Sequence, residues 1–137
     1  MFGSRLWTTH SNNNSILMFS LGDYLQYYLC VGDVDMRKGV DGLSGVARNQ
    51  MGRDPLSGEV FIFMSKGRTI VKILQWQRGG FVLYYKRLET GRFELPFYDC
   101  RTGSHNLQWS TLVMMMEGIR IKDRYFSKRY EILKKCV

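Results

Sequence analysis

Three short runs of β-branched, aliphatic and aromatic residues lie at 59–64, 69–76 and 81–88, and only short turn segments separate them. Lys66-Gly67 and Gly79-Gly80 occupy the two gaps, and glycine at such positions favours tight hairpins. The spacing predicts two consecutive hairpins, in which Phe63 lies opposite Ile70 and Trp76 lies opposite Phe81. The centre of the fold is therefore expected to be an antiparallel sheet.

Alternation along these strands gives the predicted sheet two different faces. One face is mostly aliphatic and is the better core surface. The other mixes cations with aromatic rings, a combination that can stack bases and hold phosphates. The alternative is that helices cover both faces and the cations extend from a buried aromatic layer. The residues of the mixed face are Phe61, Phe63, Lys72, Trp76, Phe81, Tyr85 and Arg87.

Two further segments have helical character. Apolar residues recur at steps of three and four between 37 and 51, with Asp35 as the expected N-cap. Residues 110–117 are followed by Gly118, a typical helix stop. We therefore expect a small single α+β domain with a three- to four-stranded antiparallel sheet. The sheet spans about 59–88, with 24–31 as a possible added strand, and helices near 37–51 and 110–117 pack on it.

Charge is unevenly distributed along the 137 residues, which carry 20 Lys and Arg against 12 Asp and Glu. Residues 1–65 hold five basic and six acidic side chains, whereas residues 66–137 hold 15 and six. The basic half indicates a polyanionic partner. The alternative is that it is only a cationic, soluble surface. We expect a flexible extension at 1–20, the α+β domain at 21–119 and a basic C-terminal segment at 120–137.

Several classes of function are disfavoured by the sequence. No cysteine pair has the spacing of a zinc or redox motif, and the two histidines, His10 and His105, lie in polar stretches. We therefore predict no cofactor and no metal. The apolar runs are too short to span a membrane, and the N-terminus does not resemble a secretory signal. The expected location is the cytoplasm.

Acidic residues crowd the first half of the chain, and metal-dependent nucleases use clustered carboxylates to hold divalent ions. A nuclease built on Asp35, Asp41 and Asp54 is therefore one possibility. Each residue also has a simpler explanation, as a helix cap, a partner of Arg37 or a turn residue. The prediction is that the protein is not an enzyme.

An ordered series of motifs covers about residues 21–120. It begins with Val34 to Leu43 and continues through Asp54-Pro55, Ser57-Gly58, Phe61-Ile62-Phe63, Val71 to Leu74, Leu83 to Leu88 and Leu112 to Ile119. This series resembles the TnpB-type, Orf2-like accessory proteins of the insertion-sequence-sixty-six family of bacterial transposable elements. Asp33, Val40 and Val82 depart from the family pattern. The matching residues of the two main motifs are Asp35, Met36, Arg37, Lys38, Gly39, Asp41, Gly42, Leu43, Asp54, Pro55, Ser57 and Gly58.

The resemblance implies a small cytoplasmic protein that acts beside a separate DDE-type transposase and is required for movement of the element. It implies no catalysis, because the chemistry belongs to that transposase. Two modes of action remain open. The first is direct contact with element ends, through Lys72, Lys86, Arg87, Arg92, Arg120, Lys122, Arg124, Lys128 and Arg129. The second is docking onto the cognate transposase through the glycines at 39, 42 and 45 or the methionine-rich helix. The oligomeric state is left open.

Overall fold

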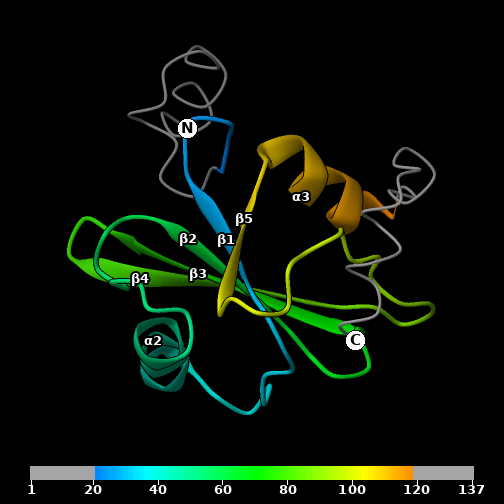
Figure 1. Cartoon of the computed structure of the whole chain (residues 1–137), viewed down its shortest axis with the longest axis horizontal. Coiled ribbons are helices and arrows are strands. Elements are labelled where there is room, and N and C mark those ends of the chain that lie inside the picture. Colours follow the sequence, from blue (N-terminus) through cyan, green and yellow to red (C-terminus); the bar gives the residue numbers. More distant parts are fainter. Residues whose placement is uncertain (1–20, 119–137) are drawn as a thin grey trace, which may run out of the picture.

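A computed structural model describes residues 21–118, which form a five-stranded sheet with one helix against each face (Figure 1). The predicted α+β class is confirmed. The expected extension at 1–20 and basic segment at 120–137 lie outside the described residues. The elements are β1 (Tyr27–Cys30), α2 (Val40–Asn49), β2 (Val60–Met64), β3 (Ile70–Gln77), β4 (Gly80–Arg87), β5 (Ser104–Leu107) and α3 (Trp109–Glu117).

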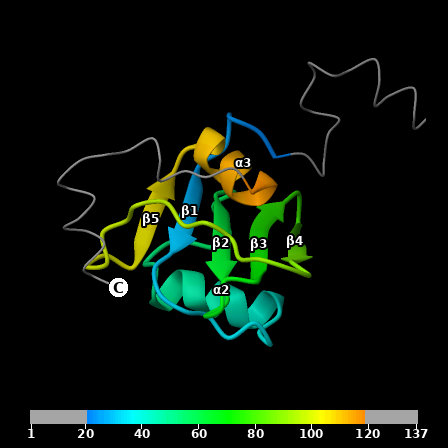
Figure 2. The same cartoon turned by 90° about the vertical axis from the view of Figure 1, so that its right-hand side faces the viewer.

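The sheet is larger than predicted and is mixed rather than antiparallel. Its strands lie in the order β4-β3-β2-β1-β5, with α3 on one side and α2 on the other (Figure 2). Strand β1 pairs in parallel with β2 because α2 connects them as a crossover. Strand β5 pairs antiparallel with β1 and was not predicted, since Ser104-His105-Asn106 lacks apolar alternation.

The second hairpin has the predicted register, with Trp76 opposite Phe81 and Lys72 opposite Tyr85. The first is shifted by two residues, so that Phe63 lies opposite Lys72 instead of Ile70. Ser65 causes the shift, because its N–H donates to the Ile70 carbonyl at 3.0 Å and its Oγ accepts from Thr69 N–H. A shift of two residues preserves the facing of every side chain, so the predicted division into two faces holds.

Helix α2 covers the aromatic face of the sheet. Leu43, Val46 and Ala47 of the helix are buried against Phe61 and Phe63 of β2, with Leu74 of β3 beside them. Each lost methylene in such a core costs on the order of 1 kcal/mol. The mixed face is therefore an interior surface over most of its area.

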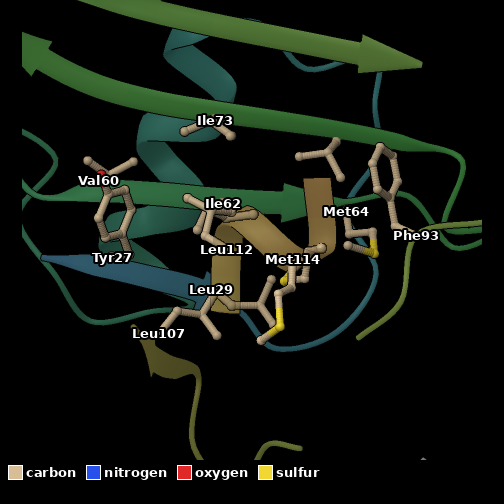
Figure 3. Packing of buried hydrophobic residues seen from close by; sticks show 12 residues of the cluster. Tyr27, Leu29, Val60, Ile62, Met64, Ile73, Phe93, Leu107, Leu112 and Met114 are labelled. Atoms are coloured by element: carbon tan, nitrogen blue, oxygen red, sulfur yellow. The ribbon is translucent and has the colours of Figure 1, made fainter. Parts of the chain in front are cut away.

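Helix α3 covers the aliphatic face. Leu112, Met114 and Met115 pack against Tyr27, Leu29, Val60, Ile62 and Ile73, and Phe93 from the β4–β5 connection closes the cluster (Figure 3). Methionine suits this position because its unbranched chain fills irregular gaps between strands. Both predicted helices thus bury their apolar sides, one on each face of the sheet.

The helix boundaries differ from the predicted ones at two N-termini. Helix α2 begins at Val40 rather than 37, with Gly39 as its N-cap, so the prediction of Asp35 as N-cap was wrong. Helix α3 begins at Trp109 with Gln108 as N-cap. Its end is as predicted, because Gly118 adopts a left-handed conformation with φ +82° that favours glycine. Within residues 21–118, no helix is long and apolar enough to cross a membrane.

Candidate nucleic-acid interface

Lys72 fixes the loop that precedes α2. Its side chain leaves β3 on the α2 side of the sheet and is only 8% exposed. The ammonium Nζ donates hydrogen bonds to the carbonyls of Met36 and Lys38, both at 2.8 Å. A buried charge is tolerated where such partners replace water. Lys72 therefore holds the backbone of residues 36–38 against the sheet and has little surface left for phosphate.

Arg37 and Lys38 present their side chains to solvent from this anchored loop. The Arg37 guanidinium contacts both oxygens of Asp35, at 3.1 Å from Nε and 2.9 Å from Nη2, and the Arg37 N–H donates to the same carboxylate. These hydrogen bonds lower the pKa of Asp35 to about 2. Since the Arg37 side chain is 91% exposed, the pair shapes the loop without closing it to other anions.

The second family motif, at 54–58, closes the connection between α2 and β2. Asp54 Oδ1 accepts from Leu56 N–H at 2.9 Å, and Gly58 adopts a φ of +90° that favours glycine. Glu59 then binds the guanidinium of Arg53 through two hydrogen bonds of 3.0 and 3.1 Å. That guanidinium lies 3.7 Å from the centre of the Tyr28 ring. The motif therefore forms the turn that brings Glu59 to Arg53.

The three carboxylates that suggested a nuclease do not form a shared metal site. Asp35 binds Arg37, Asp54 binds a turn N–H, and Asp41 is exposed in the first turn of α2. In the part of the chain that the structure describes, no three His, Cys, Asp or Glu residues gather in a way that could hold a metal ion. Cys30 is buried, and burial raises the pKa of its thiol to about 11, which disfavours the reactive thiolate.

Cations converge at one end of the sheet, and we call Lys38, Lys66, Arg68, Arg87 and Arg92 the basic end. Lys66 and Arg68 lie in the β2–β3 turn. Backbone hydrogen bonds join that turn to the chain beyond β4, from Leu88 N–H to the Thr69 carbonyl at 2.8 Å and from Phe93 N–H to the Arg68 carbonyl at 2.7 Å. The two loops are seen together at the right of Figure 1.

Tyr85 links the anchored loop to the rest of the basic end. Its ring lies 5.6 Å from Lys72 Nζ, and it is 56% exposed, which is unusual for so large a side chain. Arg87 is two residues further along β4 and therefore on the same face. It pairs with Glu89 at 3.1 Å, but both side chains are largely exposed, so the pair exchanges readily with solvent or phosphate.

Lys86 points to the opposite face and is separate from this group. Its Nζ donates to the Met116 carbonyl at 2.8 Å, near the C-terminal end of α3. A cation stabilises the partial negative charge of that helix end. The structure therefore does not join Lys72, Lys86 and Arg87 into one basic face. Arg120, Lys122, Arg124, Lys128 and Arg129 lie outside the described residues.

The glycines of α2 face different surroundings. A Cβ added at Gly39 or Gly45 would meet no described atom within 4 Å, whereas one at Gly42 would approach the Lys38 side chain at 3.0 Å. Within residues 21–118, therefore, no segment packs closely on Gly39 or Gly45. Two of the three positions are open.

Lys66 and Arg68 were not among the predicted contact residues. They belong to a turn, and their closeness to Arg92 depends on the hydrogen bond between residues 68 and 93. The available sequence feature was the presence of cations in two of the connecting segments of the basic half, the β2–β3 turn and the segment after β4.

Together, the fold and this site define a small α+β protein with an exposed basic end and an anchored loop before its first described helix. The model of the family described as IS66 Orf2 like protein matches residues 25–125. The chain belongs to that family, which associates it with insertion-sequence transposition.

Two relatives from Sinorhizobium fredii (strain NBRC 101917 / NGR234) are similar over 103 residues. The uncharacterized protein y4jC is 28% identical, with 73% of this chain and 86% of the relative covered. The uncharacterized protein y4hO is 31% identical, with 74% and 87% covered. No solved structure is significantly similar to the chain.

Proposed function

We propose that the chain is a non-catalytic accessory factor of insertion-sequence transposition that contacts DNA through the basic end of its sheet. The observation that supports this proposal is that Lys72 fixes the Lys38 backbone, and that the Lys72 ammonium also lies near the exposed Tyr85 ring. Lys72 holds the loop from below through two hydrogen bonds of 2.8 Å, and Tyr85 offers an exposed ring 5.6 Å from the same ammonium. Preorganised cations around an aromatic ring suit a phosphate backbone and its bases.

Electrostatics give this interface a measurable signature. Phosphate contacts release counterions, so that log K falls with log salt at about 0.9 per phosphate neutralised on duplex DNA. With about five contacts the slope is about −4 to −5. The basic C-terminal segment follows Gly118 in sequence and supplies further cations to the same interaction.

The test is fluorescence anisotropy of the full chain on a duplex of the element end, with a scrambled duplex of equal length beside it, between 50 and 200 mM salt. We expect Arg87→Gln with Arg92→Gln to reduce the slope by about 2. Arg48→Gln with Arg101→Gln removes the same charge away from the basic end and serves as the matched control. Absence of duplex binding at low salt, or equal effects of the two pairs, would contradict the proposal.

Docking onto the cognate transposase is the second candidate, and the open side of α2 favours it. Gly45 lies in the middle of the helix, and a Cβ there meets no described atom within 4 Å. Such a position admits a partner backbone that a side chain would exclude. Loss of transposase in a pull-down with Gly45→Ala, while DNA binding is retained, would support docking over DNA contact.

A further inference from the structure

Strand β4 forms one outer edge of the sheet, and its outward backbone groups are aligned for pairing. The hydrogen bond from Leu88 N–H to the Thr69 carbonyl fixes the alternation along this strand. Gly80, Val82, Tyr84 and Lys86 direct their backbone groups to β3. Phe81, Leu83, Tyr85 and Arg87 direct theirs away from the sheet. Within residues 21–118, these outward groups have no hydrogen-bond partner.

The two edges of the sheet are unlike each other. Strand β5 has four residues and a polar sequence, which is a common way to prevent edge pairing. Strand β4 has eight residues, and six of them, from Gly80 to Tyr85, carry no charge. Lys86 and Arg87 confine the positive charge to the last two positions. A long edge of this kind is a template for another strand, and its charge distribution selects the direction.

We propose that β4 pairs antiparallel with β4 of a second copy of this chain, joining two sheets into one about a two-fold axis. Parallel pairing would place the two Lys86-Arg87 segments side by side, and like charges in adjacent strands destabilise a sheet. Antiparallel pairing sends these segments to opposite ends of the interface. It also keeps the two basic ends apart, and Lys38, Lys66, Arg68 and Arg92 lie outside the paired strands.

One register uses all four outward residues. Phe81 lies opposite Arg87 of the second copy, and Leu83 lies opposite Tyr85 of the second copy, with both pairs repeated by symmetry. The guanidinium then reaches an aromatic ring rather than another cation, a contact that is favourable at a strand surface. Each isologous pair contributes two backbone hydrogen bonds, which is the pattern of a continuous antiparallel ladder.

The test is the mass of the full chain in solution by sedimentation and light scattering, with the chain mass of 16.1 kDa as reference. We expect a dimer for the unmodified chain and for Tyr85→Ala, and a monomer for Tyr85→Pro. Proline at position 85 removes a backbone N–H that points away from β3. Proline is tolerated at such positions of an edge strand, so the sheet itself should be retained. Circular dichroism of the variants verifies that the sheet is retained.

Amide hydrogen exchange of the unmodified chain tests the same pairing without any substitution. The N–H groups of Leu83 and Tyr85 should be protected at high protein concentration and exchange faster on dilution, because only the second copy protects them. A monomeric unmodified chain, a Tyr85→Pro dimer, or fast exchange of these amides at every concentration would overturn the proposal. Equal dissociation of Tyr85→Ala and Tyr85→Pro would also overturn it, since a side chain rather than the ladder would then hold the dimer.

Discussion

At the scale of single residues, Lys72 shows what the sequence left undecided. Its position in a strand with aromatic neighbours was compatible with two structures. One is an exposed surface that binds nucleic acid, and the other is an aromatic layer buried under a helix, from which the lysine side chain extends. The contact that decides between them joins β3 to the carbonyls of Met36 and Lys38, which are 36 and 34 residues away. Strand alternation assigns a face to Lys72, but only tertiary packing supplies these partners.

Lys72→Met should destabilise the fold by about 1–3 kcal/mol, because two buried carbonyls lose hydrogen bonds to a charged donor. Urea unfolding followed by circular dichroism measures this change. Lys66→Met, at an exposed position in a turn, is the matched control and should change stability by less than about 0.5 kcal/mol. Amide exchange in residues 36–39 should rise only for Lys72→Met. Equal stability of the two variants would show that the anchor contributes nothing.

Asp35 should titrate with a midpoint near pH 2 in a carboxyl NMR titration, because hydrogen bonds from Arg37 lower its pKa to about 2. A carboxylate with a lowered pKa contributes stability above its unfolded pKa of about 3.9 and loses it as pH falls through the folded value. Arg37→Gln should therefore return the midpoint toward about 3.9.

Asp99 provides the matched control, since Arg101 lowers its pKa to about 2 in the same way. Arg37→Gln should leave the Asp99 midpoint unchanged, and Arg101→Gln should leave that of Asp35 unchanged. A shift of both carboxyls in either variant would indicate a general change in fold rather than loss of one pair.

At the scale of elements, the sequence predicted the features that depend on interactions between residues near each other in the chain. Both hairpins, the two helices and the Gly118 stop follow from alternation, helical spacing and glycine conformation. Strand β5 was missed because its backbone pairs with β1 without apolar side chains to mark it. The start of α2 was misplaced because Lys72 binds carbonyls that a longer helix would have used. Those determinants are long-range and leave no local pattern.

Gly45→Ala and Gly118→Ala should have opposite effects on stability. Gly45 lies in the interior of α2 with open space around it, so alanine should stabilise the fold by about 0.5–1 kcal/mol. Gly118 has a φ of +82°, where alanine should cost about 1–2 kcal/mol. Urea midpoints measured under one set of conditions test both. Shifts in the same direction would contradict this assignment of the two backbone conformations.

At the scale of the whole molecule, the described residues are close to electrical balance. Residues 21–118 hold 12 basic and 10 acidic side chains. The C-terminal 19 residues hold seven basic and two acidic ones, so much of the excess lies there. The described residues therefore add little net charge. Their contribution to DNA binding would be the fixed position of the cations at the basic end. We propose that the segment from 120 onward adds affinity to an orientation that the sheet determines.

Lys128→Gln with Arg129→Gln should reduce the salt slope of duplex binding by about 2 and weaken element-end and scrambled duplexes equally. The physical reason is that phosphate contacts contribute charge and carry no sequence information. Arg87→Gln with Arg92→Gln removes the same charge from the basic end. This pair should also weaken the element-end duplex more than the scrambled one, because these cations would hold the DNA in the position where the Tyr85 ring meets its bases. Anisotropy titrations of both variant pairs at three salt concentrations measure the two effects. A different result would contradict this model: neither pair alters DNA binding, and one pair abolishes transposase capture. The cations would then bind the transposase rather than DNA.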